Sequence, residues 1–262
     1  MEIWEALLLG IVQGLTEFLP VSSSGHLVLV QNALGIGGET VMFFDVMVHV
    51  GTLIAVLTVL HKPVFELIKN PISKPMLRLV IATVPAGLAG VLLDDLIEGL
   101  FGGEFIFIPF LATAIILFIT ETVSRRTREA RPVDAKIAAV MGLGQALAIM
   151  PGLSRSGTTI ATGIVAGGNK KDVADFSFIM SIPVILGAAV LETYKMLKAG
   201  ITVDQMYLLP TLIGAVAAAV SGYFAVKWML KLVQNSNFKW FSVYLVALSI
   251  LTFVNYLTGF MW

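Results

Sequence analysis

Two short stretches of this chain carry side chains that could act together in acid–base and anion-binding chemistry. The first runs from Gln13 to His26 and contains Glu17, three consecutive serines and His26. A carboxylate, a serine hydroxyl and an imidazole could serve as base, nucleophile and acid. Gln13 and Glu17 are four residues apart and share one face of a helix, and Glu17 could equally bind a hard cation such as Mg²⁺. The alternative is that Glu17 and His26 only hydrogen-bond each other.

The second stretch, residues 151–159, reads Pro-Gly-Leu-Ser-Arg-Ser-Gly-Thr-Thr. It places Arg155 among hydroxyl groups, directly ahead of an apolar segment of helical character. The guanidinium, the hydroxyls and the first amides of that helix all donate hydrogen bonds, which is typical of an anion site. A Walker loop is excluded, because the Gly-x4-Gly-Lys pattern is absent. The alternative is an Arg155 that snorkels or has a purely structural partner.

The composition indicates the environment in which these stretches lie. The chain has 262 residues, of which 57% are hydrophobic and 13% charged, with a mean hydropathy of +0.91. Soluble domains are about 45–50% apolar and about 25% charged, so we expect a polytopic membrane protein. The balance of 17 basic and 17 acidic residues indicates no nucleic-acid partner, and the lack of cysteine excludes disulfides and thiol catalysis. The first residues carry no basic region, so no cleavable signal peptide is expected.

The chain also repeats itself. A shift of 132 residues aligns 10–35 with 142–167 and pairs seven identical residues, namely Gly10/Gly142, Gln13/Gln145, Leu15/Leu147, Ser22/Ser154, Ser24/Ser156, Gly25/Gly157 and Gly35/Gly167. We therefore expect two copies of one unit, residues 1–130 and 133–262, within a single membrane domain. Each copy should contain three transmembrane helices, at 41–60, 76–97 and 105–122 and at 173–193, 208–229 and 239–257.

A different kind of segment precedes each set of three helices, at residues 3–35 and 137–168. Both are apolar but are interrupted by Pro, Ser and Gly, and the flanks of each break are short for spanning a bilayer. This pattern predicts two re-entrant helix hairpins, which a membrane tolerates only where protein or water covers them. Three spans per copy is an odd number, so the second copy should be inverted, with the site near the midplane where the breaks meet. The predicted fold is all-α, with two inverted-topology repeats.

The basic residues predict the orientation. Most of them fall in the segments 61–78, 123–136, 169–172 and 227–239, which the positive-inside rule places in the cytoplasm. The acidic turn at 94–104 and both termini should then lie outside, and the site should open outward from a multi-pass protein of the plasma membrane.

Further residues have two interpretations each. Asp45 and His49 are four apart on the first span and either border the site or form a satisfied intramembrane pair. A set of glycines is expected to allow close helix packing: Gly10, Gly14, Gly87, Gly90, Gly214 and Gly222. The repeat aligns Ser23 with Arg155, so the first hairpin holds acid–base groups and the second an anion clamp, and one site would contain both if the hairpins meet.

Residues 13–26 and 151–159 resemble the two signature motifs of the undecaprenyl-pyrophosphate phosphatases of the bacitracin-resistance type. Length, span pattern and repeat match that family over the whole chain. The resemblance implies an integral membrane enzyme that removes the terminal phosphate of a C55 polyprenyl pyrophosphate, recycles the monophosphate carrier for cell-wall synthesis and confers bacitracin resistance.

The resemblance also implies roles for the motif residues. Glu17 would be the essential carboxylate, Ser23 the nucleophile and His26 the acid or base, while Arg155 would bind the pyrophosphate. Further substrate contacts are expected from Gln13, Ser22, Ser24, Ser154, Ser156 and Thr159. A divalent cation, Mg²⁺ or Ca²⁺, is expected near Glu17 with Gln13 as a second ligand, although an amide oxygen binds Mg²⁺ less tightly than a carboxylate. A phosphoserine intermediate and direct attack by water both stay open, as does a homodimer.

Two other functions are alternatives to this one. Inverted repeats with broken helices are transporter architecture, so the chain could move polyprenyl phosphate or a small anion, but transport does not need acid–base groups. Lipid phosphatases of the acid-phosphatase type require a histidine six residues after the arginine. Ala161 stands there, and no histidine follows His61.

Overall fold

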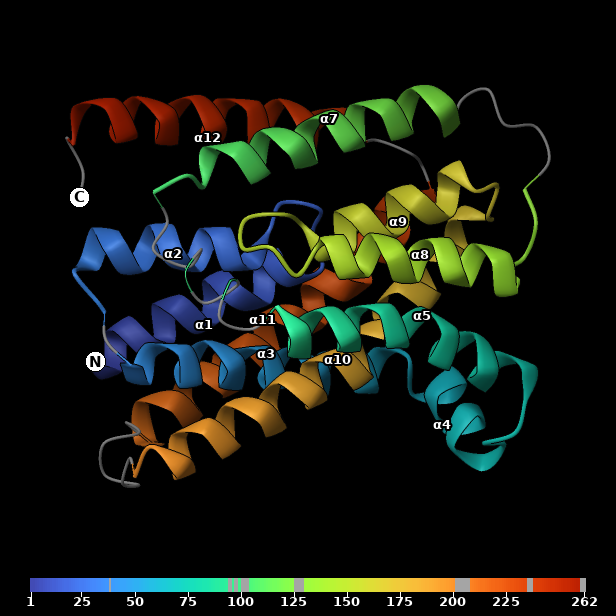
Figure 1. The fold of residues 1–262 in the computed structure, drawn as a ribbon, viewed down its shortest axis with the longest axis horizontal. Helices are drawn as coiled ribbons and strands as arrows, with labels where there is room; N and C mark the ends of the chain where they lie inside the picture. The colour runs from blue at the N-terminus through green and yellow to red at the C-terminus, as the bar shows by residue number, and fades with distance from the viewer. Residues whose placement is uncertain are drawn as a thin grey trace.

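The computed structural model describes residues 1–37, 39–93, 96, 99, 104–124, 130–200, 208–234 and 238–259. Within these residues the chain is helical, and most helices run along the long axis of the molecule (Figure 1). The helices are α1 (Ile3–Glu17), α2 (Ser23–Leu34), α3 (Glu39–Val59), α4 (His61–Lys69), α5 (Lys74–Leu92), α7 (Phe107–Ser124), α8 (Ala135–Leu147), α9 (Arg155–Val165), α10 (Lys170–Lys198), α11 (Leu208–Gln234) and α12 (Lys239–Thr258).

Six of these helices are long and apolar enough to cross a membrane: α3, α5, α7, α10, α11 and α12. They coincide with the six predicted spans, and the prediction of an all-helical multi-pass membrane protein is confirmed. The ends differ by a few residues, most at α10, which begins at Lys170 and ends at Lys198. The described residues leave out most of the predicted acidic turn at 94–104. They also leave out three basic residues of the predicted cytoplasmic segment 123–136, namely Arg125, Arg126 and Arg128.

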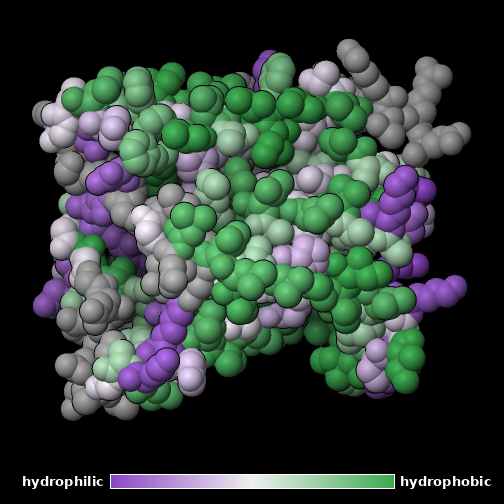
Figure 2. Space-filling model, in the orientation of Figure 1, coloured by the Kyte–Doolittle hydropathy of each residue, from purple (hydrophilic) through white to green (hydrophobic). Residues whose placement is uncertain are grey.

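Apolar side chains cover the outside of the molecule as well as its core. Figure 2 shows a broad hydrophobic band between hydrophilic ends. Large apolar side chains exposed on the helices include Leu92 on α5, Val190 on α10 and Phe224 on α11. In water such a surface would be unfavourable, because apolar area costs free energy when it is hydrated. The band is therefore the surface that contacts lipid, and Trp4 and Trp240 are exposed near helix ends.

The two segments predicted to be broken are helix–break–helix units, α1–α2 and α8–α9 (Figure 1). Ser22 caps α2 by accepting a hydrogen bond from the amide of Gly25 at 3.2 Å, and Ser154 caps α9 in the same way through the amide of Gly157 at 3.1 Å. Serine is a preferred N-cap because its hydroxyl satisfies an amide that the helix leaves free. Both breaks are therefore starts of new helices.

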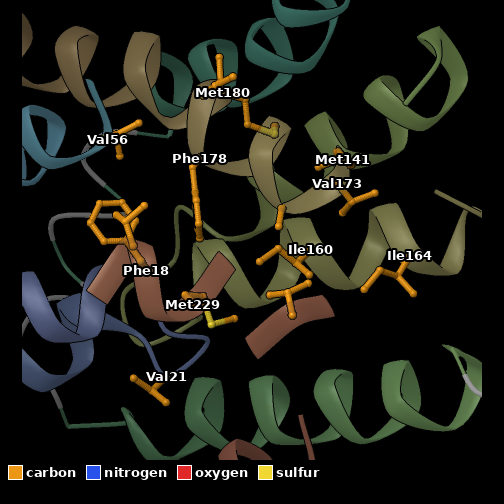
Figure 3. Close-up of a cluster of buried hydrophobic side chains, with 14 of the residues drawn as sticks. Phe18, Val21, Val56, Met141, Ile160, Ile164, Val173, Phe178, Met180 and Met229 are labelled. Carbon is orange, nitrogen blue, oxygen red and sulfur yellow. The ribbon is translucent and has the colours of Figure 1, made fainter. Parts of the chain in front are cut away.

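The two breaks are in direct contact. The amide of Gly152 donates to the Ser24 hydroxyl at 3.3 Å, and the Ser156 hydroxyl donates to the carbonyl of Leu19 at 3.0 Å. The main hydrophobic core lies against them (Figure 3). In that core Phe18, the residue after Glu17, packs edge-on against Phe178 of α10 with ring centroids 5.3 Å apart. The core thereby anchors the end of α1.

Small residues allow α1 to lie close to α11, as the sequence predicted. A side chain on Gly10 would place its Cβ 2.2 Å from the carbonyl oxygen of Gly214, and one on Gly14 would meet α11 at Ser221. The prediction was wrong for Gly87 and Gly90 of α5, which have open space where a Cβ would stand. These two glycines line a groove, and α5 is the least buried of the candidate spans.

Helix α4 was not predicted, because its sequence was interpreted as part of a cytoplasmic loop. It is only nine residues long, far shorter than a membrane span. It exposes Phe65 and Ile68 at the end of the molecule opposite the start of α1 (Figure 1).

Candidate active site

Glu17, the last residue of α1, is the centre of the polar cluster at the two breaks. Its side chain is buried, with 5% of its surface exposed. Its Oε2 accepts hydrogen bonds from the Ser23 hydroxyl at 2.5 Å and from Gln13 Nε2 at 2.8 Å. His49 Nε2 of α3 lies 3.3 Å from the same oxygen. A buried carboxylate needs such partners, because an unpaired charge in an apolar interior is strongly unfavourable.

Arg155, the first residue of α9, supplies the counter-charge. Its Nη2 forms an ion pair with Glu17 Oε1, and its Nη1 donates to the carbonyl of Ser177 at 3.5 Å. The Arg155 side chain is 16% exposed. The ion pair between Arg155 and Glu17 joins the two sequence motifs across 138 positions of the chain. The structure therefore brings the predicted carboxylate and the predicted anion-binding arginine together.

The serines of the first break are held in an unusual backbone. Ser22 has φ = 69°, the one positive φ at a non-glycine residue in the described part of the chain. Such a conformation is unfavourable for most residues and is often found at functional sites. Gly25 allows the turn to pass close to α7, because a Cβ there would lie 2.5 Å from the Phe110 ring. The strained turn directs Ser23 at Glu17.

A cavity of about 210 Å³ opens beside this cluster. Six predicted site residues line it: Glu17, Ser22, Ser23, Ser24, Ser154 and Arg155. The other lining residues include His49 of α3 and Gln145 of α8. The cavity thus has a carboxylate, a guanidinium and several hydroxyls on its wall, which suits an anion whose oxygens accept hydrogen bonds.

His26 is placed differently from what its sequence position suggested. Its Nδ1 lies 2.7 Å from the carbonyl oxygen of Ser22, and its Nε2 lies 2.7 Å from the hydroxyl of Tyr244 on α12, against which the ring stacks. A carbonyl only accepts, so Nδ1 carries the proton and donates. His26 is not among the residues that line the cavity. In this conformation it holds the strained Ser22, and its acid–base role stays a prediction.

Ser156 and Thr159 lie behind the cavity wall. The Ser156 hydroxyl donates to Leu19, and Thr159 Oγ1 is 2.8 Å from the Arg155 carbonyl oxygen and 2.6 Å from the Ser177 hydroxyl. Both residues are fully buried. Their hydrogen bonds support Arg155 and the contact between the breaks, and direct binding of substrate by them stays a prediction.

Two cavity residues, His49 and Gln145, lie outside both sequence motifs. The sequence allows His49 to be either a neighbour of the site or a partner of Asp45, and the structure places its Nε2 beside Glu17. Its Nδ1 donates to the backbone carbonyl of Asp45 at 2.6 Å, while the Asp45 side chain accepts from Gln31. In the sequence Gln145 stands out only as the repeat partner of Gln13. That match is the one sequence signal that could have identified it as a site residue.

These features define a multi-pass membrane protein with a buried carboxylate–guanidinium centre and an anion-sized cavity at two helix breaks. The family model described as bacitracin resistance protein BacA matches residues 6–251, and the chain belongs to that family.

Curated relatives agree over nearly the full length. The chain is 41% identical to the undecaprenyl-diphosphatase of Methanobrevibacter smithii, with 98% of this chain and 99% of the relative covered. It is 41% identical to that of Carboxydothermus hydrogenoformans, with 95% and 96% covered, and to that of Parabacteroides distasonis, with 96% and 97% covered. The family resemblance predicted from the motifs is confirmed, and the transporter alternative is not favoured.

Proposed function

We propose that this protein hydrolyses undecaprenyl diphosphate to the monophosphate and inorganic phosphate, with Glu17, Ser23 and Arg155 at the reacting centre. Membership of the family and the names of its relatives support the activity. The observation that carries the assignment of the site is the Glu17–Arg155 ion pair, which joins both motifs at the wall of one cavity.

A groove beside the cavity supports a lipid substrate. It has a volume of about 360 Å³, lies between α3, α5 and α10, and is lined mainly by apolar side chains. Four residues line both spaces: His49, Ile149, Val184 and Ala188. Gly87, Gly90 and Gly187 widen the groove, since nothing stands within 4 Å of a Cβ placed on them. The diphosphate would occupy the cavity while the first isoprene units lie in the groove.

The proposed reaction starts from Ser23. Its hydroxyl already donates to Glu17, so Glu17 can take the proton as Oγ attacks the terminal phosphorus. The bond from that phosphorus to the bridging oxygen breaks, and the monophosphate lipid leaves. Water then attacks the phosphoserine, the bond from phosphorus to Ser23 Oγ breaks, and Glu17 returns the proton to Oγ as phosphate is released. The alternative is direct attack by a water held at Glu17. Acid quenching with labelled substrate distinguishes the two routes, because direct attack by water leaves no label on the protein.

Arg155 has two roles in this proposal. In the structure it neutralises Glu17, which leaves that carboxylate a weak base. An incoming diphosphate offers the guanidinium a pair of oxygens in bidentate geometry. As Arg155 turns to the phosphates, Glu17 loses one of its partners and becomes a stronger base. Substrate binding would thereby activate the site, and the guanidinium would stabilise the charge that develops on the phosphoryl group.

A divalent cation fits the residues present only if the substrate supplies part of its coordination. No group of three or more His, Cys, Asp or Glu able to hold a metal occurs in the described ranges. Gln13 Oε1, however, is buried without a partner beside Glu17. Mg²⁺ often binds one or two carboxylates together with substrate phosphates. Glu17 and Gln13 would hold the ion, which would neutralise phosphate charge.

We also propose that the chain consists of two inverted repeats with re-entrant hairpins, each hairpin lying before its three spans. Helices α1, α2, α8 and α9 have 15, 12, 13 and 11 residues, too short for a bilayer core of about 30 Å at about 1.5 Å per residue.

The contacts support two equivalent halves. The shift of 132 that relates the halves turns the close contact of Gly10 with Gly214 into that of Gly142 with Ala82. The caps of α2 and α9 are related by the same shift. The proposed copies are residues 1–130 and 133–262, and a homodimer stays a prediction.

The proposed orientation places the site open to the outside of the plasma membrane. Helix α12 ends on the side where α1 begins, and α4 with its lysines lies at the opposite end (Figure 1). The absence of cysteine makes a direct test possible. A cysteine replacing Lys198 should react with an impermeant maleimide in intact cells, and one replacing Lys69 only after permeabilisation. The reverse pattern would overturn the orientation.

The activity is tested by phosphate release from undecaprenyl diphosphate by the full chain purified in detergent. The assay is run with Mg²⁺ and with EDTA, and with Glu17→Ala and Arg155→Ala in parallel. Metal-dependent turnover that both substitutions abolish would support the proposal. A folded wild-type protein without turnover would refute the activity, and turnover unchanged by EDTA would refute the cation.

A further inference from the structure

Gln145 is a buried amide without a partner in the wall of the cavity. The residue is 1% exposed and lies near the end of α8. Neither its Nε2 nor its Oε1 has a hydrogen-bond partner in the structure. Four buried side-chain atoms in the described residues share this condition, and three of them are amide atoms of Gln13 and Gln145. Buried polar groups are nearly always paired, so an amide with both ends free calls for an explanation.

The sequence explains why the partner is missing. Gln145 corresponds to Gln13 under the shift of 132, and Gln13 donates to the carboxylate four residues later, at Glu17. The residue four positions after Gln145 is Ile149, which has no acceptor. The second half of the chain has the glutamine but lacks the acid that would bind it. Any partner of Gln145 must therefore come from elsewhere in the cavity.

The composition of the wall shows what kind of partner fits. Gln145 shares the cavity with Arg155, Ser154 and the serines of the first break. This is the set of donors that would surround the phosphates of the substrate. An amide Nε2 has two hydrogens to donate, and the oxygens of a phosphate accept several hydrogen bonds each.

We infer that Gln145 is a substrate-binding residue whose Nε2 donates a hydrogen bond to a non-bridging oxygen of the diphosphate. The inference rests on the proposed function and assigns to that site a residue outside the two signature motifs. The amide is already buried at the cavity wall before substrate binds, and it gains its hydrogen-bond partner when substrate enters.

This role gives an unusual prediction for Gln145→Met, which keeps the length of the side chain and removes its polar atoms. Loss of an unpaired buried amide should raise the melting temperature of the substrate-free protein, because no native hydrogen bond is lost. The same change should lower kcat/KM for undecaprenyl diphosphate by about tenfold to a hundredfold, the usual effect of losing one hydrogen bond to a charged group. Gln145→Glu should lower it further, because a carboxylate would face the phosphates.

Gln234→Met is a matched control at an exposed glutamine near the end of α11, and its activity should equal that of wild type. Wild-type activity in Gln145→Met would refute the inference while leaving the proposed function intact. A lower melting temperature together with lower activity would also refute it, since Gln145 would then have a structural partner. A wild-type protein without turnover would refute the proposed function instead, and the two failures are thus distinguishable.

Discussion

The Glu17–Arg155 pair gives a prediction that separates stability from catalysis. Glu17 is buried and Arg155 is partly buried, with 5% and 16% of their side-chain surfaces exposed. Removing one partner of such a pair leaves the other charge uncompensated, which typically costs about 3–5 kcal/mol. The two partners are not equivalent, however. Glu17 keeps three other contacts when Arg155 is lost, from Gln13, Ser23 and His49.

Arg155 keeps fewer contacts than this when Glu17 is lost. In the described part of the chain its guanidinium has one other hydrogen bond, the 3.5 Å contact with the Ser177 carbonyl. We therefore expect Glu17→Gln to cost the full 3–5 kcal/mol or so and Arg155→Met to cost about 1–3 kcal/mol. At about 2–4 °C per kcal/mol, the melting temperature should fall by roughly 6–20 °C and by roughly 2–12 °C.

The double variant completes the test. Glu17→Gln combined with Arg155→Met removes both charges, so its melting temperature should recover to at least that of Arg155→Met alone. Phosphate release should stay lost in all three variants, because recovered stability restores neither the base nor the guanidinium. Thermal unfolding followed by tryptophan fluorescence in detergent measures the first quantity. A double variant as unstable as Glu17→Gln, or an Arg155→Met less stable than Glu17→Gln, would refute the reasoning.

Three further predictions concern the break and the groove. Ser23→Ala should reduce turnover by roughly a thousandfold or more and should lower the melting temperature, because the buried Glu17 loses a hydrogen-bond donor; acid quenching of wild type with labelled substrate should trap phosphoserine, which the variant cannot form. Gly25→Ala should destabilise the protein by about 1–3 kcal/mol through overpacking against Phe110, as measured by thermal unfolding; an unchanged melting temperature would contradict the close contact. Gly90→Leu should fill the groove and raise KM for the C55 diphosphate more than KM for a short-chain diphosphate, and an equal change for both would argue against a tail in the groove.

The spans and the breaks could be predicted because they depend on local properties of the sequence. Six apolar runs of sufficient length predict six helices, and the Pro, Ser and Gly residues within two further runs predict where the backbone changes direction. The grouping of Glu17, Ser23 and Arg155 required one additional assumption, that the breaks meet. The structure confirms that assumption through the contacts of Ser24 and Ser156.

The identity of the histidine beside Glu17 could not be predicted in this way. His26 is close to Ser23 in sequence, but the start of α2 turns its ring toward Tyr244 of α12. His49 is far from both motifs in sequence and reaches Glu17 because α3 packs against α1. Sequence spacing gives the face of a helix on which a residue lies, whereas the neighbour of that face is set by tertiary packing.

The two halves differ at the positions where the charges lie, and this difference suits the proposed substrate. The shift of 132 pairs Glu17 with Ile149 and Ser23 with Arg155. Identical residues in both halves would place two carboxylates beside a polyanion, or two arginines with no base between them. With one carboxylate and one arginine, the first half could attack the terminal phosphate while the second half holds the diphosphate. A diphosphate ester is itself asymmetric, with one free phosphate and one bound to lipid. A site built from unlike halves can tell the two phosphates apart, and Gln145, which has Ile149 where Gln13 has Glu17, belongs to the half proposed to hold them.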